Sequence, residues 1–358
     1  MMQYRDTYAT ISLRNIKDNV DIVYSMVNKP MIAIIKANAY GHGYKEVALT
    51  LRDNPYIQMF GVATLKEAVD LRRMGITQDI LVLGAIPLKD LGIAIVHDIS
   101  LTLFSDAYLQ NIIRHHHYDR PVKVHIGIDS GMNRIGFKSR EQFVAAMSQI
   151  EPDKIQVEGV FTHFATADEP DKTDEYEKQL ALFKSIIDGY DFRYVHCDNS
   201  AAMMYHHSDF GNLGRIGIAM YGIEASGEES TCLKQAMSLY TKVTMVKTVP
   251  KGEKIGYGMT YTTTEDERIA TLPIGYADGF IRANQGRHVY INGKYYPIVG
   301  RVCMDQCMVK VDDSVNVNDH VEIFGKHISL ASMARDLDTI AYEIICLISM
   351  RVERYYEN

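Results

Sequence analysis

The stretch that decides the fold is Met31-Ile-Ala-Ile-Ile-Lys-Ala-Asn-Ala-Tyr-Gly-His-Gly43. Four apolar residues, 32–35, run without interruption and end at Lys36, which the turn residues Asn38, Gly41 and Gly43 follow. Such a run predicts a strand buried on both faces, as in a parallel sheet. Lys36 would then lie where α/β barrels carry catalytic side chains. A lysine in apolar surroundings has a lowered pKa and attacks carbonyl groups to form a Schiff base. The alternative is a strand-end lysine that simply reaches solvent.

A regular alternation of strands and helices extends from this stretch over the first two thirds of the chain. Eight segments have the pattern of strands and begin near residues 31, 60, 79, 101, 122, 156, 194 and 214. Apolar residues at helical spacing follow most of them, and right-handed crossovers then predict a closed (β/α)₈ barrel of the TIM type. The alternative is an open doubly wound sheet, but no Gly-x-Gly-x-x-Gly follows an early strand.

Short β-like segments replace this alternation after about residue 235. They lie at 240–249, 255–261, 267–273, 288–291, 294–299, 308–311 and 320–324, and Asn292-Gly293 is typical of a tight hairpin turn. An apolar helical stretch follows at 341–347. We therefore expect a barrel at 1–235 and a C-terminal, mostly β domain at 236–358. The first strand, at 7–13, is a candidate to join the β domain.

The composition excludes several classes of protein. The formal net charge is −7 and no long basic run occurs, so a nucleic-acid partner is not expected. The first residues lack the apolar segment of a signal peptide, and no apolar run approaches the roughly 18 residues that span a bilayer. The five cysteines are scattered, which favours a reducing compartment over a disulfide framework. We therefore expect a cytoplasmic protein without a membrane segment.

Two clusters of metal-ligand residue types are better explained without a metal. Cys303 and Cys307 are four residues apart, but no second Cys or His pair of ligand spacing accompanies them, which predicts buried strand residues. The histidines at 115–117 follow an apolar helical stretch and predict a solvated helix end. No metal site is expected.

Polar clusters follow four of the predicted barrel strands. They are Asp129-Ser-Gly-Met-Asn-Arg134-Ile-Gly136, Thr162-His163-Phe-Ala-Thr-Ala-Asp168, Asp198-Asn199-Ser200 and Gly214-Arg215-Ile-Gly217-Ile218. Any one of them alone would be an ordinary loop, in which such residues serve backbone geometry. Because the ends of parallel barrel strands meet at one face, the four clusters together with Lys36 predict an active site. Ser200 and the amides of Gly217 and Ile218 would form an anion site after the last two strands, where barrels commonly bind phosphate.

The segment from Ile35 to Gly43 resembles the pyridoxal-phosphate lysine motif of the alanine racemases. The four polar clusters match the same family, and the resemblance runs over nearly the whole chain. Further matches in the β domain are Gly256-Tyr257-Gly258, Pro273-Ile-Gly-Tyr-Ala-Asp-Gly279 and Val299-Gly-Arg-Val-Cys-Met-Asp-Gln306. The resemblance implies a racemase that interconverts L- and D-alanine, either to make D-alanine for peptidoglycan or to break it down.

The resemblance also implies a role for each matching residue. Lys36 holds pyridoxal phosphate, and Tyr257 is the second acid/base, so that one group takes the α-hydrogen and the other returns a proton on the opposite face. Arg215 faces the pyridine nitrogen, which stays unprotonated because a guanidinium does not give up its proton. The other assignments are Tyr40, Asn199, Ser200, Gly217 and Ile218 around the cofactor, His163 near Tyr257 and the ring, Arg134 and the backbone amide of Met304 on the substrate carboxylate, and Tyr276 and Asp305 at the pocket and its entrance. In this family the tyrosine comes from the partner subunit, which implies a homodimer with a shared active site.

Two departures from the family pattern bear on specificity. The family's modified lysine, two residues before Asp129, is here Gly127, so another group or an anion has to steady Arg134. The tyrosine of the family's C-terminal Ser-Tyr-Arg is here Met350, so the pocket is expected to admit side chains larger than methyl. The alternatives are therefore a serine or broader-specificity racemase, a decarboxylase on the same barrel, and a non-enzymatic protein that binds pyridoxal phosphate.

Overall fold

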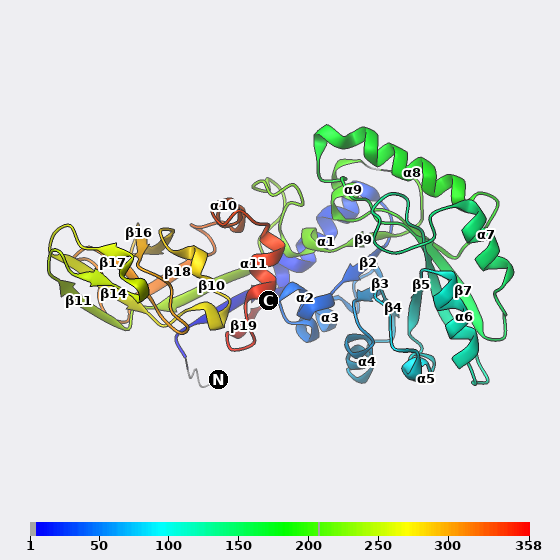
Figure 1. The fold of residues 1–358 in the computed structure, drawn as a ribbon, viewed down its shortest axis with the longest axis horizontal. Helices are drawn as coiled ribbons and strands as arrows, with labels where there is room; N and C mark the ends of the chain where they lie inside the picture. Colours follow the sequence, from blue (N-terminus) through cyan, green and yellow to red (C-terminus); the bar gives the residue numbers. More distant parts are fainter. Residues whose placement is uncertain (1–4, 207) are drawn as a thin grey trace.

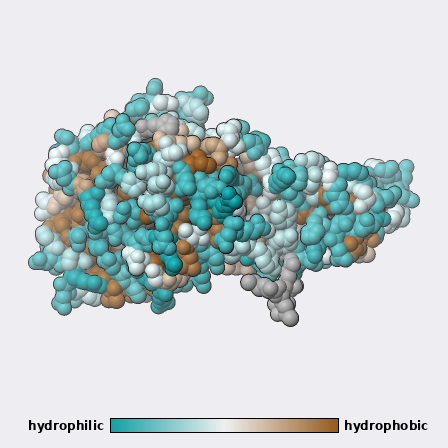
Figure 2. All heavy atoms as spheres, turned by 180° about the vertical axis from the view of Figure 1, so that it is seen from behind, coloured by the Kyte–Doolittle hydropathy of each residue, from teal (hydrophilic) through white to brown (hydrophobic). Residues whose placement is uncertain are grey.

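The structure is a computed structural model that describes residues 5–206 and 208–358. Two parts are evident in the ribbon: strands and helices in alternation at one end, and an extended β sheet at the other, with α11 between them (Figure 1). Seen from behind, the molecule has a broad lobe and a narrower one, and polar residues cover most of both (Figure 2). Residues 1–4 lie outside the described residues. They belong to the N-terminal segment in which the sequence analysis expected no signal peptide.

Eight parallel strands form the barrel. They are β2 (Met31–Ile34), β3 (Ile57–Val62), β4 (Asp79–Val82), β5 (Ser100–Leu103), β6 (Val122–Gly127), β7 (Ile155–Phe161), β8 (Tyr194–His196) and β9 (Gly214–Ile216). The sheet order is β8-β7-β6-β5-β4-β3-β2-β9, with parallel register throughout. Backbone hydrogen bonds join its two edges, since Arg215 N donates to Asp198 O at 2.9 Å. The predicted barrel is therefore confirmed.

Helices follow the strands in sequence and cover the outside of the barrel. They are α1 (Leu13–Val27), α2 (Lys36–Tyr40), α3 (Tyr44–Leu51), α4 (Leu65–Arg73), α5 (Leu91–Val96), α6 (Asp106–His115), α7 (Arg140–Ser148), α8 (Thr173–Ile187) and α9 (Ser200–Tyr205), with 3₁₀ turns η1 (Leu88–Asp90), η2 (Pro170–Lys172) and η3 (Ile218–Tyr221). Several begin at a side-chain cap that the sequence supplies: Thr64, Ser105 and Ser139 each accept a hydrogen bond from the third residue of their helix.

The second part is a nine-stranded sheet in the order β11-β14-β17-β16-β15-β18-β10-β1-β19. Its strands, together with the two-stranded ribbon β12–β13, are β1 (Tyr8–Ser12), β10 (Met237–Lys242), β11 (Met245–Val249), β12 (Lys254–Ile255), β13 (Tyr261–Thr262), β14 (Glu267–Leu272), β15 (His288–Ile291), β16 (Lys294–Val299), β17 (Cys307–Val311), β18 (His320–Phe324) and β19 (Glu353–Glu357). Its helical segments are η4 (Tyr257–Met259), η5 (Tyr276–Asp278), η6 (Arg282–Asn284), α10 (Leu330–Asp336) and α11 (Ala341–Leu347). β1 pairs antiparallel with β10 and parallel with β19, so the start and the end of the chain lie side by side in this sheet.

The structure corrects three of the predicted strands. The segment 240–249 is two strands, because Val243 N donates to Asp319 O and Thr244 N to Thr271 O, which carries the chain from one part of the sheet to another. The segment 255–261 is interrupted by η4, where Gly256 and Gly258 have φ of 74° and 72°. The strand expected at 214–220 ends at residue 216 and continues as η3. α10 and β19 were not predicted.

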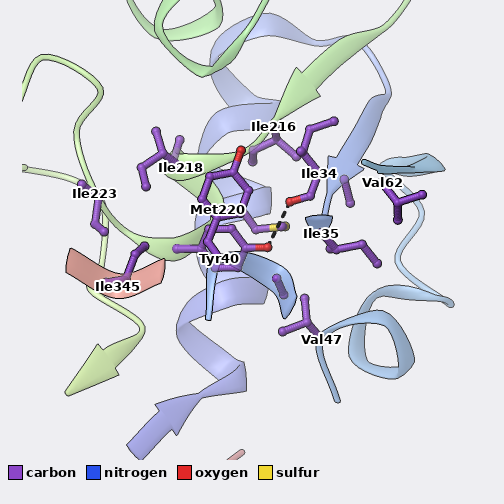
Figure 3. Packing of buried hydrophobic residues seen from close by; sticks show 14 of the residues in the cluster. Ile34, Ile35, Tyr40, Val47, Val62, Ile216, Ile218, Met220, Ile223 and Ile345 are labelled. Atoms are coloured by element: carbon purple, nitrogen blue, oxygen red, sulfur yellow. Dashed lines mark hydrogen bonds between the residues drawn. The ribbon is translucent and has the colours of Figure 1, made fainter. Parts of the chain in front are cut away.

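One hydrophobic core continues from the barrel into the β domain. Around the end of β2, Ile34 and Tyr40 pack with Ile216 and Ile218 of the β9–η3 segment and with Ile345 of α11 (Figure 3). The buried Tyr221 hydroxyl donates to Ile34 O at 3.0 Å. The end of β2, from which Lys36 emerges, is therefore held rigidly from three sides.

Candidate active site

The sequence predicts that Lys36 ends its strand. In the structure, β2 ends at Ile34, so Lys36 lies two residues beyond the strand. The chain there forms a left-handed turn: Ala37, Asn38, Ala39 and Tyr40 have φ between 51° and 57°. Each non-glycine residue in this conformation costs roughly 1–2 kcal/mol. Gly41, also at positive φ, closes the turn by donating its N–H to Ala37 O at 3.0 Å. Helical hydrogen bonding thus begins directly at Lys36, which ends the strand early.

A cavity of about 660 Å³ opens at the carboxyl ends of the barrel strands, where Lys36 emerges. It brings together every site residue that the sequence placed in the barrel. These residues are Lys36, Tyr40, Arg134, His163, Asn199, Ser200, Arg215, Gly217 and Ile218. The cavity therefore unites residues from both sides of the barrel around one amine.

The amine of Lys36 is poised to lose its proton. Burial lowers its pKa from the ordinary lysine value, and the positive charges of Arg134 and Arg215 lower it further. Glu67 and Cys346 act in the opposite sense. Because only the neutral amine is a nucleophile, the lowered pKa raises the fraction of Lys36 that can attack a carbonyl carbon.

A small polar cradle lies beside this amine. The Ser200 hydroxyl accepts hydrogen bonds from the backbone amides of Gly217 and Ala219, at 3.0 and 3.4 Å. A Cβ atom added to Gly217 would come within 3.1 Å of the Tyr40 hydroxyl, so the glycine keeps open the space between them. The hydroxyls of Tyr40 and Ser200 border this space, and hydroxyl groups can donate hydrogen bonds to the oxygens of a phosphate group.

The guanidinium group of Arg215 makes several hydrogen bonds to neighbouring residues. Its side chain is buried and donates to the carbonyl oxygens of Thr162, His196 and Cys197, at 2.7, 2.6 and 2.9 Å. It also contacts Nδ1 of His163 at 3.2 Å and Nδ1 of His196 at 3.1 Å. Burial lowers the pKa of Arg215 to about 10, so the group remains a cation at neutral pH.

His163 is neutral in this arrangement. Burial, and then the charge of Arg215, hold its pKa well below the ordinary histidine value. Because Arg215 donates toward Nδ1, this nitrogen acts as the acceptor and the proton resides on Nε2. His163 therefore presents an N–H toward the cavity without carrying a charge.

Arg134 lies in a loop that is fixed at its start and exposed at its tip. The Asp129 carboxylate accepts hydrogen bonds from the amides of Gly131 and Asn133, at 3.1 and 2.8 Å, which shapes the loop. A Cβ added to Gly127 would meet no atom closer than 3.6 Å. A Cβ at this position would therefore be in ordinary van der Waals contact with Phe161, Thr102 and Leu103, without a clash.

The structure does not bring Tyr257, Tyr276, Met304 and Asp305 into the cavity of their own chain. They lie on the β domain and are exposed to solvent, Tyr257 to 72%, Met304 to 52% and Tyr276 to 43%. Tyr276 N donates to Cys303 O at 3.1 Å, so the Tyr276 and Met304 segments are joined. Asp305 pairs with Arg351 at 2.8 Å. These residues form a second group, which is ordered but separate from Lys36.

Several residues of the site were not assigned from the sequence. His196, which contacts Arg215, also approaches His125 in the barrel interior, with 2.9 Å between Nε2 and Nδ1. Histidines in two barrel strands were visible in the sequence, but nothing there showed that both point inward. Tyr342 and Cys346 of α11 also line the cavity. That helix was predicted, yet only the tertiary structure places it over the barrel.

Met350, the second departure, is 77% exposed and lies beside the left-handed turn. The amide nitrogen of Asn38 is 3.4 Å from its sulfur. Met350 therefore lies near the Lys36 site but does not line the cavity of its own chain, and its effect on pocket size stays a prediction.

The described residues contain neither a membrane-spanning helix nor a cluster of metal-ligand side chains. None of their helices is long and apolar enough to cross a bilayer. Within residues 5–206 and 208–358, no three His, Cys, Asp or Glu side chains are grouped as a metal site would require.

Comparison with known proteins identifies the family. Residues 11–225 match the alanine racemase N-terminal domain, and residues 236–356 match the alanine racemase C-terminal domain. The curated alanine racemase of Halalkalibacterium halodurans is 42% identical over 373 residues, which cover 99% of this chain and 95% of that protein. A solved alanine racemase from Bacillus anthracis with bound L-Ala-P has a TM-score of 0.94 and 40% identity, covering 100% of this chain and 96% of that one.

A solved histidine racemase from Leuconostoc mesenteroides subsp. sake is also similar. It has a TM-score of 0.91 and 28% identity, and the match covers 100% of this chain and 99% of that one. Racemases named for different amino acids thus share this architecture. With family matches over both parts and a full-length relative at 42% identity, the chain belongs to the alanine racemase family.

Proposed function

We propose that this protein interconverts L- and D-alanine, using pyridoxal phosphate held by Lys36. The observation that carries the proposal is the position of the Lys36 amine, with its lowered pKa, in one cavity with the Ser200–Gly217 cradle and the Arg215 cation. The family is pyridoxal-phosphate-dependent, and the residues present fit that group.

Each part of the cavity has a matching part of the cofactor. Lys36 would hold its aldehyde carbon, and Tyr40, Ser200, Gly217 and Ile218 its phosphate. Arg215 would lie against the ring nitrogen, with Asn199 and His163 nearby. When bound, the cofactor supplies an electron sink that makes the α-hydrogen of an amino acid acidic. The protein supplies placement and the groups that move the proton.

Two groups on opposite faces of the substrate carbon would carry that proton. The neutral amine of Lys36 accepts it on one face, and the hydroxyl of the partner subunit's Tyr257 donates one on the other. Reversing these two roles converts the opposite enantiomer. Arg134 and the backbone amide of the partner subunit's Met304 would bind the substrate carboxylate, with the partner's Tyr276 and the partner's Asp305 at the entrance.

The separation of the two groups of residues supports a homodimer with a shared site. Tyr257 and Met304 are ordered on the β domain but exposed, and their own chain does not carry them to Lys36. A closed two-fold assembly would place each β domain over the other barrel and complete two sites at once.

Mixing two inactive variants tests this proposal directly. Lys36→Ala removes one acid/base and Tyr257→Phe the other, so each homodimer would be inactive. In a mixed dimer, one site combines both changes and the other retains both native groups. Statistical mixing should therefore restore roughly a quarter of wild-type racemisation, since half of the dimers are mixed and each has one intact site. No recovery after verified subunit exchange would contradict a shared site.

The chemistry itself has a separate test. Pyridoxal phosphate held by Lys36 would give a visible absorption band. Borohydride should abolish this band by reducing the bond between lysine and cofactor, which leaves a stable adduct on the peptide containing residue 36. Incubation of L-alanine in deuterated water should yield D-alanine labelled at the α-carbon. A non-enzymatic binder would show the band without α-hydrogen exchange, and a decarboxylase would release carbon dioxide instead.

A broader racemase of serine or larger amino acids is the second candidate. It is favoured by Met350, an exposed flexible side chain beside Asn38 near the Lys36 site. The similar histidine racemase shows that this architecture is used for a bulky substrate. A panel of L-amino acids, each followed by chiral chromatography, separates the candidates: measurable turnover of alanine alone would exclude the broader one.

A further inference from the structure

The Glu67 carboxylate lies at the start of α4 and accepts three backbone hydrogen bonds. Its Oε2 accepts from the amides of Ala63 and Thr64, at 2.9 and 3.0 Å. Thr64 in return accepts from the Glu67 amide at 3.3 Å, which completes a capping box. The third bond is different, because Oε1 accepts from the amide of Ala37 at 2.8 Å. Capping explains the bonds around α4, but not the bond to the residue that follows Lys36.

The Ala37 amide is where the chain enters its least favourable conformation. Ala37 is the first of four consecutive non-glycine residues at positive φ. Such a segment persists only where its surroundings hold it in place. Its far end is held by Asn38, whose side chain accepts from the Tyr44 amide at 3.1 Å, and by the ring of His42, whose Nδ1 lies 3.0 Å from Ala39 O. Glu67 fixes the start of this segment by accepting from the amide of Ala37, the residue directly after Lys36.

Glu67 also contributes a charge at this position. The charged or ionisable groups that influence the Lys36 amine are Arg134, Arg215, Cys346 and Glu67. The two arginines favour the neutral amine, whereas Cys346 and Glu67 favour the ammonium form. Glu67 is the carboxylate of this set, so it partly offsets the two arginines. The same side chain thus acts on the backbone beside Lys36 and on its protonation.

We propose that Glu67 is a positioning residue for Lys36: its carboxylate anchors the Ala37 amide, and so sets the direction in which the Lys36 side chain leaves β2 for the cavity. The proposal rests on the proposed function for its catalytic meaning. Its physical content concerns only this chain's own residues. A purely capping role for Glu67 is the competing explanation.

Three variants of the full-length protein separate these explanations. Glu67→Gln retains the size of the side chain but removes its charge. It also leaves one acceptor oxygen where the carboxylate has two, so the amides of residues 37, 63 and 64 can no longer all be satisfied. Glu67→Asp retains the charge but does not reach Ala37. Thr64→Ala disrupts the helix cap and leaves the bond from Ala37 to Glu67 in place. Each variant is examined for thermal unfolding, for affinity toward added pyridoxal phosphate, and for the pH dependence of Lys36 acetylation by acetic anhydride, read by peptide mass spectrometry.

Glu67→Gln should weaken the retention of pyridoxal phosphate by about tenfold, the effect of losing one charge-assisted hydrogen bond. It should also move the acetylation midpoint of Lys36 to lower pH, because removing a negative charge favours the neutral amine. Glu67→Asp should weaken retention while leaving that midpoint close to wild type. Thr64→Ala should lower only the unfolding temperature.

The proposal is overturned if Glu67→Gln matches wild type in both retention and midpoint, or if Thr64→Ala reproduces both changes. Borohydride trapping of pyridoxal phosphate on wild-type Lys36 tests the proposed function separately. If trapping fails there while the acetylation midpoint still shifts in Glu67→Gln, the positioning role stands and the proposed function falls.

Discussion

The two groups of site residues differ in how they are held. In the barrel, Arg215 is buried and bonded to three carbonyl oxygens, and Ser200 accepts from two backbone amides. On the β domain, Tyr257 and Met304 are ordered but open to solvent. The barrel residues therefore form their cavity within one chain, whereas Tyr257 and Met304 remain exposed on the surface of that chain.

The two groups also differ in charge. The barrel group contains Lys36, Arg134 and Arg215, which suits a phosphate and a carboxylate. In the β-domain group, the Asp305 carboxylate is already paired with Arg351. That group therefore offers phenol hydroxyls and a backbone amide rather than net charge. In the proposed function, this difference corresponds to a barrel that binds anionic groups and a second group that supplies a proton donor.

The largest expected effect comes from breaking the β-domain group. Tyr257→Phe should lower racemisation by about 10²–10⁴-fold, the usual contribution of a positioned acid or base. Retention of pyridoxal phosphate should not change, because the barrel group is intact. In deuterated water, one enantiomer should continue to exchange its α-hydrogen at the face served by Lys36.

Tyr295→Phe is the matched control, since Tyr295 is an exposed tyrosine of the same β domain whose hydroxyl donates to His327 O at 3.0 Å. It should leave racemisation unchanged. Equal rates in Tyr257→Phe and wild type would remove Tyr257 from the mechanism.

Breaking the barrel group at Arg215 should have the next largest effect. Arg215→Lys replaces a planar group that satisfies three carbonyls with a single ammonium, and should reduce racemisation about a hundredfold. The carbonyl oxygens left unpaired should also lower the unfolding temperature. Arg193→Lys, at an exposed position near the barrel, is the control. Racemisation within about twofold of wild type would show that the cation alone, without its fork of hydrogen bonds, is sufficient.

Acid should destabilise the barrel before the β domain. His42 is buried, and its pKa is lowered to about 4 by burial, whereas the three histidines of the β domain are exposed. Below pH 6.5, His42 is protonated in the unfolded chain but stays neutral in the folded protein until the pH approaches 4. His42 should therefore contribute a fall of roughly 1.4 kcal/mol in the free energy of unfolding for each pH unit between about 6.5 and 4. The buried histidines 125, 163 and 196 of the barrel, whose pKa values are also lowered, add to this fall.

His42→Asn removes the titrating group and keeps a donor for the carbonyl of Ala39. Urea unfolding at several pH values measures the difference in the free energy of unfolding between wild type and variant. This difference should narrow as the pH falls. A constant difference across this range would show that His42 is protonated in the folded state as well. His320→Asn, at an exposed β-domain position, should leave the pH dependence unchanged.

The smallest expected effect concerns the rim between the two groups. Met350→Tyr introduces a rigid ring beside Asn38 and should reduce turnover of serine relative to alanine by about tenfold, a range typical of pocket-size discrimination. Met350→Leu, similar in volume, should change that ratio little. The ratio of kcat/KM for the two substrates is the measurement. An unchanged ratio in Met350→Tyr would show that this position does not line the substrate pocket.

Prediction from sequence succeeded where the position of a residue depends on its own strand. The apolar run before Lys36, and the polar clusters that begin at Asp129, Thr162, Asp198 and Gly214, follow buried strands. Parallel strands place all their carboxyl ends at one face of the barrel. Identifying the residues at these strand ends was therefore sufficient to find the site residues of the barrel. The cavity lined by these residues agrees with that prediction.

Prediction failed where the backbone departs from regular geometry or where distant segments meet. The left-handed turn at Ala37–Tyr40 contains only one residue type that favours positive φ, so no local signal marked it. The short β19, rich in charge and tyrosine, shows no core pattern, because it lies at the edge of its sheet beside β1. The bond from Ala37 to Glu67 joins residues thirty positions apart, and only the folded barrel brings them together.

By itself, the sequence determined the barrel, the family and the chemical types around Lys36, because strand order and motif spacing are local properties of the chain. The tertiary structure decided which way Lys36 leaves its strand, how Arg215 is held, and that Tyr257 lies outside its own cavity. These features depend on contacts between segments far apart in the chain, and on surfaces that one chain alone leaves exposed.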